Sequence, residues 1–392
     1  MDIFEKCYKY EDAKNAIKQG YYPYFIPFEA SEGTEVIYKG RRIIMCGSNN
    51  YLGLTTHPKV KEAALEAIRK YGTSCTGSRF LNGTLAMHEQ LELELAEWVT
   101  KPAALIFSTG MQTNLGTISA LVGRDDYVIL DKEDHASIVD GARLGYGKLE
   151  RYRHNDMDHL ERVLQSIPAE AGKLIVVDGV FSMEGDLAPV PQLVEVAKKY
   201  GVRLMIDDAH GMGVTGEGHG TAWHYALVKE VDLVMSTFSK SFASLGGFIA
   251  GEVDVVDYIK HNARSLIFSA SPTPASTASA LAALHIMRAE PERVTRVNQI
   301  ADKMRTGFKQ MGFDTGTSCT PIVPLLIGDN IKTFMAWKSL FEAGVFVNPV
   351  ISPAVAAGRQ MLRTSYMATH TDDQLDRVLG IFEKVGKNLG LI

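Results

Sequence analysis

The feature of the sequence that most constrains its fold is a regular alternation of short apolar runs with helix-length stretches. The runs are rich in Val, Ile, Leu and Phe, and they occupy residues 104–107, 127–130, 174–177, 203–206, 233–235 and 248–250. Apolar runs of this length, each followed by room for a helix, are typical of βαβ units, which build a parallel sheet. We therefore expect an α/β fold with a mostly parallel central sheet.

The pattern changes after residue 285, where helix-length stretches alternate with β-rich runs at residues 322–327, 345–347 and 361–366. We interpret this part as a smaller C-terminal α+β domain. The predicted organisation is an N-terminal helix and β-hairpin arm over residues 1–55, a large domain over residues 56–285, and the small domain over residues 286–392.

One helix of the large domain can be placed in more detail. Thr56 and Pro58 are typical of a helix start, and Gly72 is typical of a helix end. Apolar residues recur between them at helical spacing, at Val60, Ala64, Ile68 and Tyr71. We expect this helix to serve packing rather than chemistry.

Composition narrows the class of protein. The chain has 392 residues, of which 46% are apolar and 22% charged, and this is enough to bury two cores without disulfides. The net charge of -5 provides no basic stripe for nucleic acid, and the basic cluster at residues 39–42 is typical of a solvated hairpin edge. We expect no nucleic-acid partner.

The four cysteines and the N-terminus bear on location. Cys7, Cys46, Cys75 and Cys319 lie far apart with no C-x-x-C spacing, which indicates neither a metal site nor a disulfide framework. The N-terminal residues are charged, and no apolar run approaches the roughly 20 residues of a membrane span. We expect a cytoplasmic protein whose only membrane contact would be peripheral, at the inner membrane.

Polar or glycine residues follow several of the predicted strands directly. They are Gly110, His135, Ser182, Asp207 and Lys240. Ligands of parallel α/β sheets bind beyond the carboxyl ends of the strands. We therefore expect these residues, from distant parts of the sequence, to meet in one crevice.

Lys240 indicates the chemistry of that crevice. Most lysines are solvated surface charges, but Lys240 follows an apolar strand and is flanked by small residues in Ser-Thr-Phe-Ser-Lys-Ser. Upstream, Asp207 and His210 lie three residues apart at another strand end. Pyridoxal 5'-phosphate (PLP) requires a lysine for its aldehyde, a carboxylate against its ring nitrogen, and hydroxyls or amides for its phosphate. The two segments supply these three kinds of group.

The same segments resemble the α-oxoamine synthase family of PLP-dependent acyltransferases nearly from end to end. The stretches that carry the resemblance are residues 48–54, 77–84, 134–138, 181–186, 207–210 and 236–241. Each stretch alone is weak evidence for the family, but the stretches together are specific to it. The resemblance implies an aminotransferase type I fold, a homodimer with active sites at the interface, and condensation of an amino acid with an acyl-CoA thioester with loss of carbon dioxide.

The resemblance also implies roles around the cofactor ring. Lys240 would hold the cofactor and act as general base, Asp207 would pair with the pyridine nitrogen, and His135 would stack on the ring. His210 and Ser182 would reach the phenolic oxygen. Taken singly, an aspartate at a strand end is often a helix cap, and a buried histidine is often structural.

The phosphate and the substrate have their own implied residues. Gly110, Met111, Thr237 and Ser239 would bind the phosphate, because glycine permits close backbone approach at a helix start and hydroxyls donate to it. The family segment at Ser269 and Ala270 reaches the phosphate of the neighbouring subunit. Arg363, assisted by Asn49, would hold the carboxylate of the amino acid, for which a bidentate arginine is suited.

Some motif residues carry no implied chemistry. Arg79, in the glycine-rich stretch of residues 77–84, is expected to form only a structural ion pair, and no metal is expected.

Short sequence segments indicate which substrates the protein uses. The segments around Lys240, Arg79 and Val345 resemble the bacterial serine palmitoyltransferases of the family, whereas other branches more often carry Gly before and Ala after the lysine. We therefore expect serine and a long acyl-CoA such as palmitoyl-CoA, giving a 3-ketosphinganine-type base for sphingolipid synthesis. The alternatives are an 8-amino-7-oxononanoate synthase using alanine and a pimeloyl thioester, a glycine C-acetyltransferase, a plain aminotransferase, or a non-catalytic partner subunit.

Overall fold

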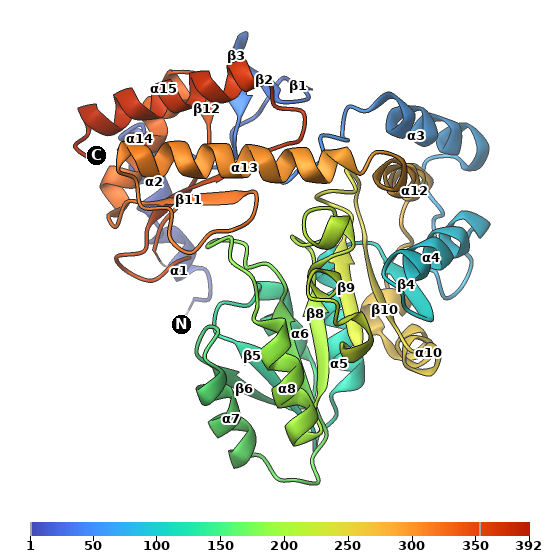
Figure 1. Cartoon of the computed structure of the whole chain (residues 1–392). Coiled ribbons are helices and arrows are strands. Elements are labelled where there is room, and N and C mark those ends of the chain that lie inside the picture. The colour runs from blue at the N-terminus through green and yellow to red at the C-terminus, as the bar shows by residue number, and fades with distance from the viewer. Residues whose placement is uncertain (1, 353) are drawn as a thin grey trace.

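The structure is a computed structural model that describes residues 2–352 and 354–392. Its largest element is a seven-stranded sheet (Figure 1). In order across the sheet the strands are β4 (Ala103–Phe107), β10 (Gly247–Gly251), β9 (Leu233–Thr237), β8 (Arg203–Asp207), β7 (Lys173–Asp178), β5 (Tyr127–Asp131) and β6 (Lys148–Tyr152). All neighbouring pairs are parallel except those of β10, which runs antiparallel to β4 and β9. The predicted mostly parallel α/β sheet is confirmed.

Helices cover both faces of this sheet, so that its central strands are buried on both sides (Figure 1). One face packs against α5 (Gly110–Leu121), α6 (Ala136–Leu144), α10 (Val253–Asn262) and α11 (Arg264–Ile267). The other packs against α4 (Ala86–Trp98), α7 (Met157–Ser166), α8 (Val190–Tyr200) and α12 (Pro274–Ala289). Burial on both faces is the reason that these strands are continuous apolar runs in the sequence.

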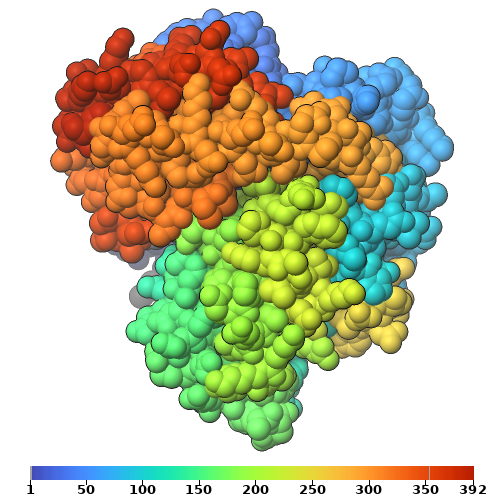
Figure 2. All heavy atoms as spheres, viewed as in Figure 1, coloured from blue at the N-terminus to red at the C-terminus, as the bar shows by residue number. Residues whose placement is uncertain are grey.

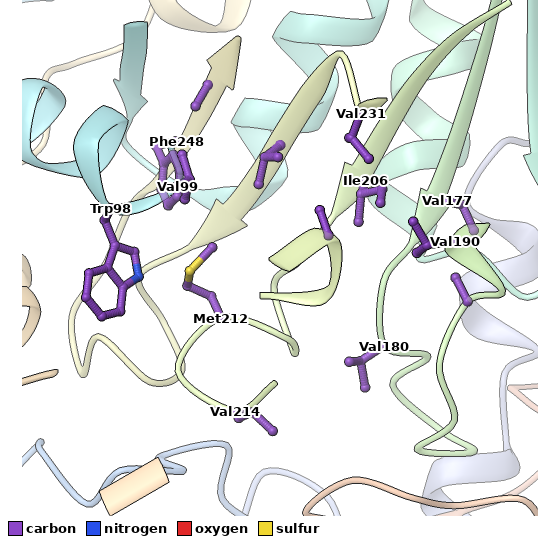
Figure 3. Close-up of a cluster of buried hydrophobic side chains, with 14 of the residues drawn as sticks. Trp98, Val99, Val177, Val180, Val190, Ile206, Met212, Val214, Val231 and Phe248 are labelled. Carbon is purple, nitrogen blue, oxygen red and sulfur yellow. The ribbon is translucent and has the colours of Figure 1, made fainter. Parts of the chain in front are cut away.

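Alternate residues of each strand enter different cores. Ile106 of β4 belongs to the core on the α4 and α8 side, whereas Leu105 and Phe107 belong to the core on the α5 and α6 side. This follows from the two-residue period of a strand. Figure 3 shows part of the first core, where Ile206 and Val177 of the sheet lie near Val190 of α8.

The helix predicted from Thr56 is α3 (Pro58–Tyr71), which packs against α12. It ends as expected at Gly72, whose φ of 79° is in the left-handed region that favours glycine. Its N-cap is His57, not Thr56, because the His57 ring accepts a hydrogen bond from the backbone N–H of Lys59. Ile68 is exposed, so the buried side of the helix is narrower than the pattern predicts.

The C-terminal part begins with α13 (Glu292–Met311), the long helix along one end of the sheet domain (Figure 1). It also contains α14 (Asn330–Glu342), α15 (Asp372–Asn388) and an antiparallel sheet of β11 (Ile322–Leu326), β14 (Met361–Ser365) and β13 (Asn348–Val350). This part has a core of its own, which includes Phe308, Trp337 and Phe382.

The N-terminal segment joins the C-terminal part through a second sheet. It has two short helices, α1 (Glu5–Tyr8) and α2 (Asp12–Lys18), and the strands β1 (Ala30–Glu32), β2 (Glu35–Tyr38) and β3 (Arg41–Met45). Strand β3 pairs in parallel with β12 (Val345–Phe346). Figure 2 shows the result, with the blue N-terminal residues beside the red and orange C-terminal residues at one end of the molecule.

Candidate active site

The carboxyl ends of the parallel strands open into a cavity of about 220 Å³. Its lining includes residues at or within four residues after the ends of β4, β5, β8 and β9. Of the site residues expected from the sequence, it contains Gly110, Met111, His135, Ser182, Asp207, His210, Thr237, Ser239 and Lys240. Segments from more than one hundred residues of sequence therefore converge on one place, as the strand pattern indicates.

Lys240 lies partly buried in this cavity. Burial lowers the pKa of its ammonium group to about 8, although the carboxylates of Asp207 and Asp178 act in the opposite direction and Arg363 adds to the lowering. A lysine with this pKa supplies a neutral amine near neutral pH, which an ordinary lysine does not.

Asp207 ends β8 and is almost fully buried, at 3% exposure. Its Oδ2 accepts a hydrogen bond of 2.7 Å from the side-chain amide of Asn114, and its Oδ1 accepts one of 3.0 Å from the backbone N–H of Ala209. Both donors favour a carboxylate held in one orientation toward the cavity.

A second carboxyl group, Asp178 at the end of β7, also lines the cavity. It accepts a hydrogen bond from the backbone N–H of His135 at 3.1 Å. Burial raises the pKa of Asp178 well above its ordinary value, and the charge of Asp207 adds to that effect. The two acids therefore differ in role: Asp207 is held by hydrogen-bond donors, and Asp178 favours the protonated form.

His210 is buried against Tyr51, whose hydroxyl lies 2.7 Å from the Nδ1 atom of the ring. Burial lowers the pKa of His210 well below its ordinary value, and the charges of Lys240 and Arg363 lower it further. Burial also raises the pKa of Tyr51 to about 12. Both groups are therefore neutral at neutral pH, and His210 can form a hydrogen bond without carrying a charge.

The start of α5 forms one end of the cavity. Thr109 caps this helix by accepting a hydrogen bond from the N–H of Gln112, and the first helical residue is Gly110. A Cβ atom at Gly110 would lie only 2.7 Å from Oγ1 of Thr237. Glycine is therefore required for β9 and the helix start to come this close. The hydroxyls of Thr237 and Ser239, 2.9 Å apart, lie beside this helix start.

Ser269 and Ala270 lie outside the cavity lining and contact the same helix start from a different side. Gln112 of α5 donates to Oγ of Ser269 at 2.8 Å, and the hydroxyl of Ser108 donates to the carbonyl of Ala270. Ala270 is exposed and Ser269 is half-buried.

Arg363 and Asn49 are brought together, although they lie at opposite ends of the chain. Arg363 of β14 is buried, and it donates to the carbonyl of Ser182 at 2.5 Å and to Oδ1 of Asn49 at 3.1 Å. Asn49 lines a second opening, of about 480 Å³, that shares Ser239 and Lys240 with the first cavity. The guanidinium therefore lies beside the segment that carries Ser182, and Asn49 and Lys240 line the same opening.

Sequence reasoning missed several residues of the site. Asn114, Ser137 and Asp178 line the cavity, and Tyr51 contacts His210. Asp178 ends its strand as Asp207 does, and Asn114 follows Gly110 by one helical turn. These two positions are the sequence features that could have identified both residues as part of the site. Ser137 and Tyr51 lie inside motif stretches, but nothing in the pattern distinguishes them from packing residues.

The environment of Arg79 is that of a structural ion pair, as expected. Its guanidinium binds both carboxylate oxygens of Glu92, at 2.8 and 3.1 Å, with both side chains nearly buried. Within residues 2–352 and 354–392, no group of three or more His, Cys, Asp or Glu is arranged to hold a metal ion.

A larger crevice, of about 340 Å³, lies at the amino ends of the same strands. Its walls are mainly apolar, and two of its charged groups, Arg203 and Asp232, are paired with each other at 2.7 Å. None of the site residues expected from the sequence lines it, so we place the chemistry in the cavity around Lys240.

Comparison with known proteins identifies the family of the chain. The model of the family "Aminotransferase class I and II" matches residues 41–382. The chain is 53% identical to a serine palmitoyltransferase of Sphingobacterium spiritivorum over 94% of this chain and 93% of that protein. It is 51% identical to a serine palmitoyltransferase of Bacteroides ovatus over 99% of both.

A solved structure shows the same fold. The structure of a serine palmitoyltransferase from S. paucimobilis, carrying a PLP–myriocin aldimine, superposes with a TM-score of 0.96 at 36% identity, over 100% of both chains. An 8-amino-7-oxononanoate synthase of Alkaliphilus metalliredigens is more distant, at 40% identity over 98% of this chain and 97% of that protein. The predicted aminotransferase type I fold is confirmed, and the chain belongs to the aminotransferase class I and II family.

Proposed function

We propose that this chain is a PLP-dependent serine palmitoyltransferase, which condenses L-serine with palmitoyl-CoA, releases carbon dioxide and CoA, and forms 3-ketosphinganine. The proposal rests on the similarity of this chain, over nearly its whole length, to proteins named serine palmitoyltransferase. The cavity around Lys240 supplies the matching chemistry.

The residues of the cavity fit PLP. Gly110 leaves the backbone at the start of α5 free of a Cβ atom, beside the hydroxyls of Thr237 and Ser239, which suits a phosphate. Lys240 would hold the aldehyde carbon through Nζ, and Asp207 would hold a proton at the ring nitrogen. His210 and Ser182 would donate to the phenolic oxygen. When bound, PLP supplies an electron sink for the pair released at the substrate Cα.

The protein groups then do the proton chemistry. The amine of Lys240 has a lowered pKa. Once this amine no longer holds the cofactor, it would accept the Cα proton of serine. Two N–H groups donate to the Asp207 carboxylate and would hold it in place opposite the ring nitrogen. Arg363 and Asn49 orient the serine carboxylate, so that its bond to Cα can be aligned for loss of carbon dioxide.

The partner in this proposal is a second copy of the chain. Large apolar side chains are exposed at Met111 and Leu245 of the cavity lining, at Phe268 next to Ser269, and at Phe80 and Leu81 of the glycine-rich stretch. Apolar side chains grouped in this way are typical of a protein interface. A homodimer in which Ser269 and Ala270 reach the phosphate site of the neighbouring subunit would account for the exposed position of Ala270.

The location of the protein is also part of the proposal. In the described residues, no helix is both long and apolar enough to cross a membrane. We propose a cytoplasmic enzyme with peripheral contact at the inner membrane, where its acyl substrate and its lipid product partition.

The proposal is tested by thiol release from palmitoyl-CoA with serine, alanine or glycine as separate co-substrates. We expect release with serine, loss of release in Lys240→Ala, and no loss in a control that changes the exposed Lys229 to Ala. Activity only with alanine and a pimeloyl thioester would assign the chain to 8-amino-7-oxononanoate synthesis. A protein that binds PLP but forms no yellow species and releases no thiol would be a non-catalytic partner subunit.

A further inference from the structure

Two buried polar side chains, Asn114 and Ser137, join the residues on either side of the cofactor cavity. Asn114 lies on α5 and Ser137 on α6, and they are 0% and 2% exposed. The amide nitrogen of Asn114 lies 2.7 Å from Oδ2 of Asp207 and 2.9 Å from Oγ of Ser137. The same Oγ lies 2.7 Å from Nδ1 of His135. A continuous chain of hydrogen bonds therefore runs from Asp207 to His135.

The direction of each bond is fixed by the chemistry of the groups. An ionised carboxylate only accepts, so the nitrogen of the Asn114 side chain, and not its oxygen, faces Asp207. The amide has two hydrogens, and the second points to Ser137. Since Ser137 accepts from Asn114, its own hydroxyl hydrogen is free to donate to Nδ1 of His135.

A second donor reaches the same ring nitrogen. The backbone N–H of Ser137 donates to Nδ1 of His135 at 3.2 Å, which makes the imidazole the N-cap of α6. A ring nitrogen that accepts from two donors carries no proton. His135 is therefore the neutral tautomer with its hydrogen on Nε2.

This tautomer suits the ring that His135 would cover. A PLP ring protonated at its nitrogen, opposite Asp207, carries positive charge, and an imidazolium stacked on it would be repelled. A neutral imidazole is not repelled, and it keeps an N–H at Nε2 as a donor.

We propose that Asn114 and Ser137 are positioning residues, which link the carboxylate of Asp207 to the tautomer and ring orientation of His135. The proposal rests on the proposed function for its significance, but the hydrogen-bond chain itself is a property of the protein alone. It predicts that the hydrogen bonds from Asp207 to Ser137 help to fix the tautomer of His135, and that removal of the Ser137 hydroxyl leaves this tautomer less well defined.

The first experiment measures the tautomer directly in the holoenzyme and in the cofactor-free protein. With ¹⁵N-labelled histidine, NMR distinguishes protonated from unprotonated ring nitrogens, and the signals of His135 are those lost in His135→Asn. We expect an unprotonated Nδ1 and a protonated Nε2 in the wild type at neutral pH. A protonated Nδ1 in the wild type would overturn the proposal, whether or not the enzyme is active.

Three serine variants then separate positioning from packing. In Ser137→Ala only the longer backbone N–H donor, at 3.2 Å, remains on Nδ1 of His135, so we expect a mixture of His135 tautomers. We also expect kcat to fall about 10- to 100-fold, because a displaced ring no longer fits the reacting geometry. Ser137→Thr, which keeps a hydroxyl, should restore the single tautomer. The matched control is Ser119→Ala, because Ser119 lies on α5 but donates only to the Leu115 carbonyl, and it should change neither measurement.

The outcomes also separate this proposal from the proposed function. If Ser137→Ala keeps the wild-type tautomer, the chain of hydrogen bonds does not set it and the proposal fails, even when thiol release from palmitoyl-CoA is normal. If the tautomer shifts as expected but no amino acid supports thiol release, the hydrogen-bond chain stands and the assigned reaction fails.

Discussion

Replacement of Lys240 should stabilise the cofactor-free protein, because the lysine is held there for chemistry and not for packing. Its pKa in the folded protein is about 8, lowered first by burial, whereas an unfolded lysine titrates near 10.4. One pKa unit corresponds to ~1.4 kcal/mol, so burial of the charged form costs about 3 kcal/mol at pH 7. Lys240→Met removes this cost and keeps the volume of the side chain.

The sign of the pH dependence follows from the same values. The lysine pKa is lower in the folded state, so the unfolded state binds more protons between pH 8 and 10.4, and the wild type gains stability as pH rises through that window. The advantage of Lys240→Met should therefore be largest at pH 7 to 8 and should nearly vanish by pH 10.4.

Urea unfolding of the cofactor-free proteins at several pH values measures this difference. Subtraction of the wild-type from the variant free energy removes the contribution of the shared titrating groups that do not interact with Lys240. A difference that does not change between pH 7.5 and 10, or a variant less stable than the wild type at pH 7.5, would refute the assignment of Lys240 as a buried amine of lowered pKa.

Three further predictions concern other parts of the structure. Arg79→Ala leaves the carboxylate of Glu92 unpaired in a nearly buried site and should lower the free energy of unfolding by about 3–5 kcal/mol in a urea titration. Arg69→Ala, which breaks an exposed pair, should have a much smaller effect in the same titration. Gly110→Ala places a Cβ atom 2.7 Å from Oγ1 of Thr237 and should weaken PLP binding in a fluorescence titration. The control Gly380→Ala adds a Cβ atom in open space on α15 and should leave the PLP affinity unchanged. Burial opposes the charge of His154, but hydrogen bonds to Asp131 and Asp186 outweigh it and raise its pKa to about 10. Its charge therefore stabilises the folded state fully below pH 6.5, and His154→Asn should lose stability most there and progressively less toward pH 10; an equal loss at pH 6 and pH 10 would contradict this.

The sequence predicts the central sheet well because its strands are buried on both faces. Such strands are apolar throughout, and their helices separate them cleanly, so β4, β5, β7, β8, β9 and β10 each coincide with a predicted run. Strand β6 (Lys148–Tyr152) was missed because it lies at the sheet edge, pairs only with β5, and carries charged residues. Strand β13 (Asn348–Val350) was missed because it is three residues long and contains Pro349.

Contacts between distant segments could not be predicted from local patterns. The pairing of β3 with β12 joins the two ends of the chain, and nothing in the apolar pattern of either strand specifies the other. The domain boundaries at residues 55 and 285 stay predictions, since this pairing connects the N-terminal segment to the C-terminal part.

The candidate site also contains some residues that local patterns could place and others that they could not. Residues at strand ends, such as Asp207 and Lys240, could be placed because the carboxyl ends of parallel strands meet at one edge. Asn114 and Ser137 could not, because their contact depends on how α5 packs against α6. The roles of the site residues toward PLP and serine stay predictions.

The central claim is that the chain joins serine to palmitoyl-CoA with loss of the serine carboxylate. Serine labelled with ¹³C in its carboxyl group tests it most directly, with the labelled carbon dioxide, the free thiol and the lipid product measured together. The account predicts one labelled carbon dioxide for each thiol released and an unlabelled 3-ketosphinganine. Thiol release with the label retained in the product, or transfer of the serine amine without thiol release, would contradict it.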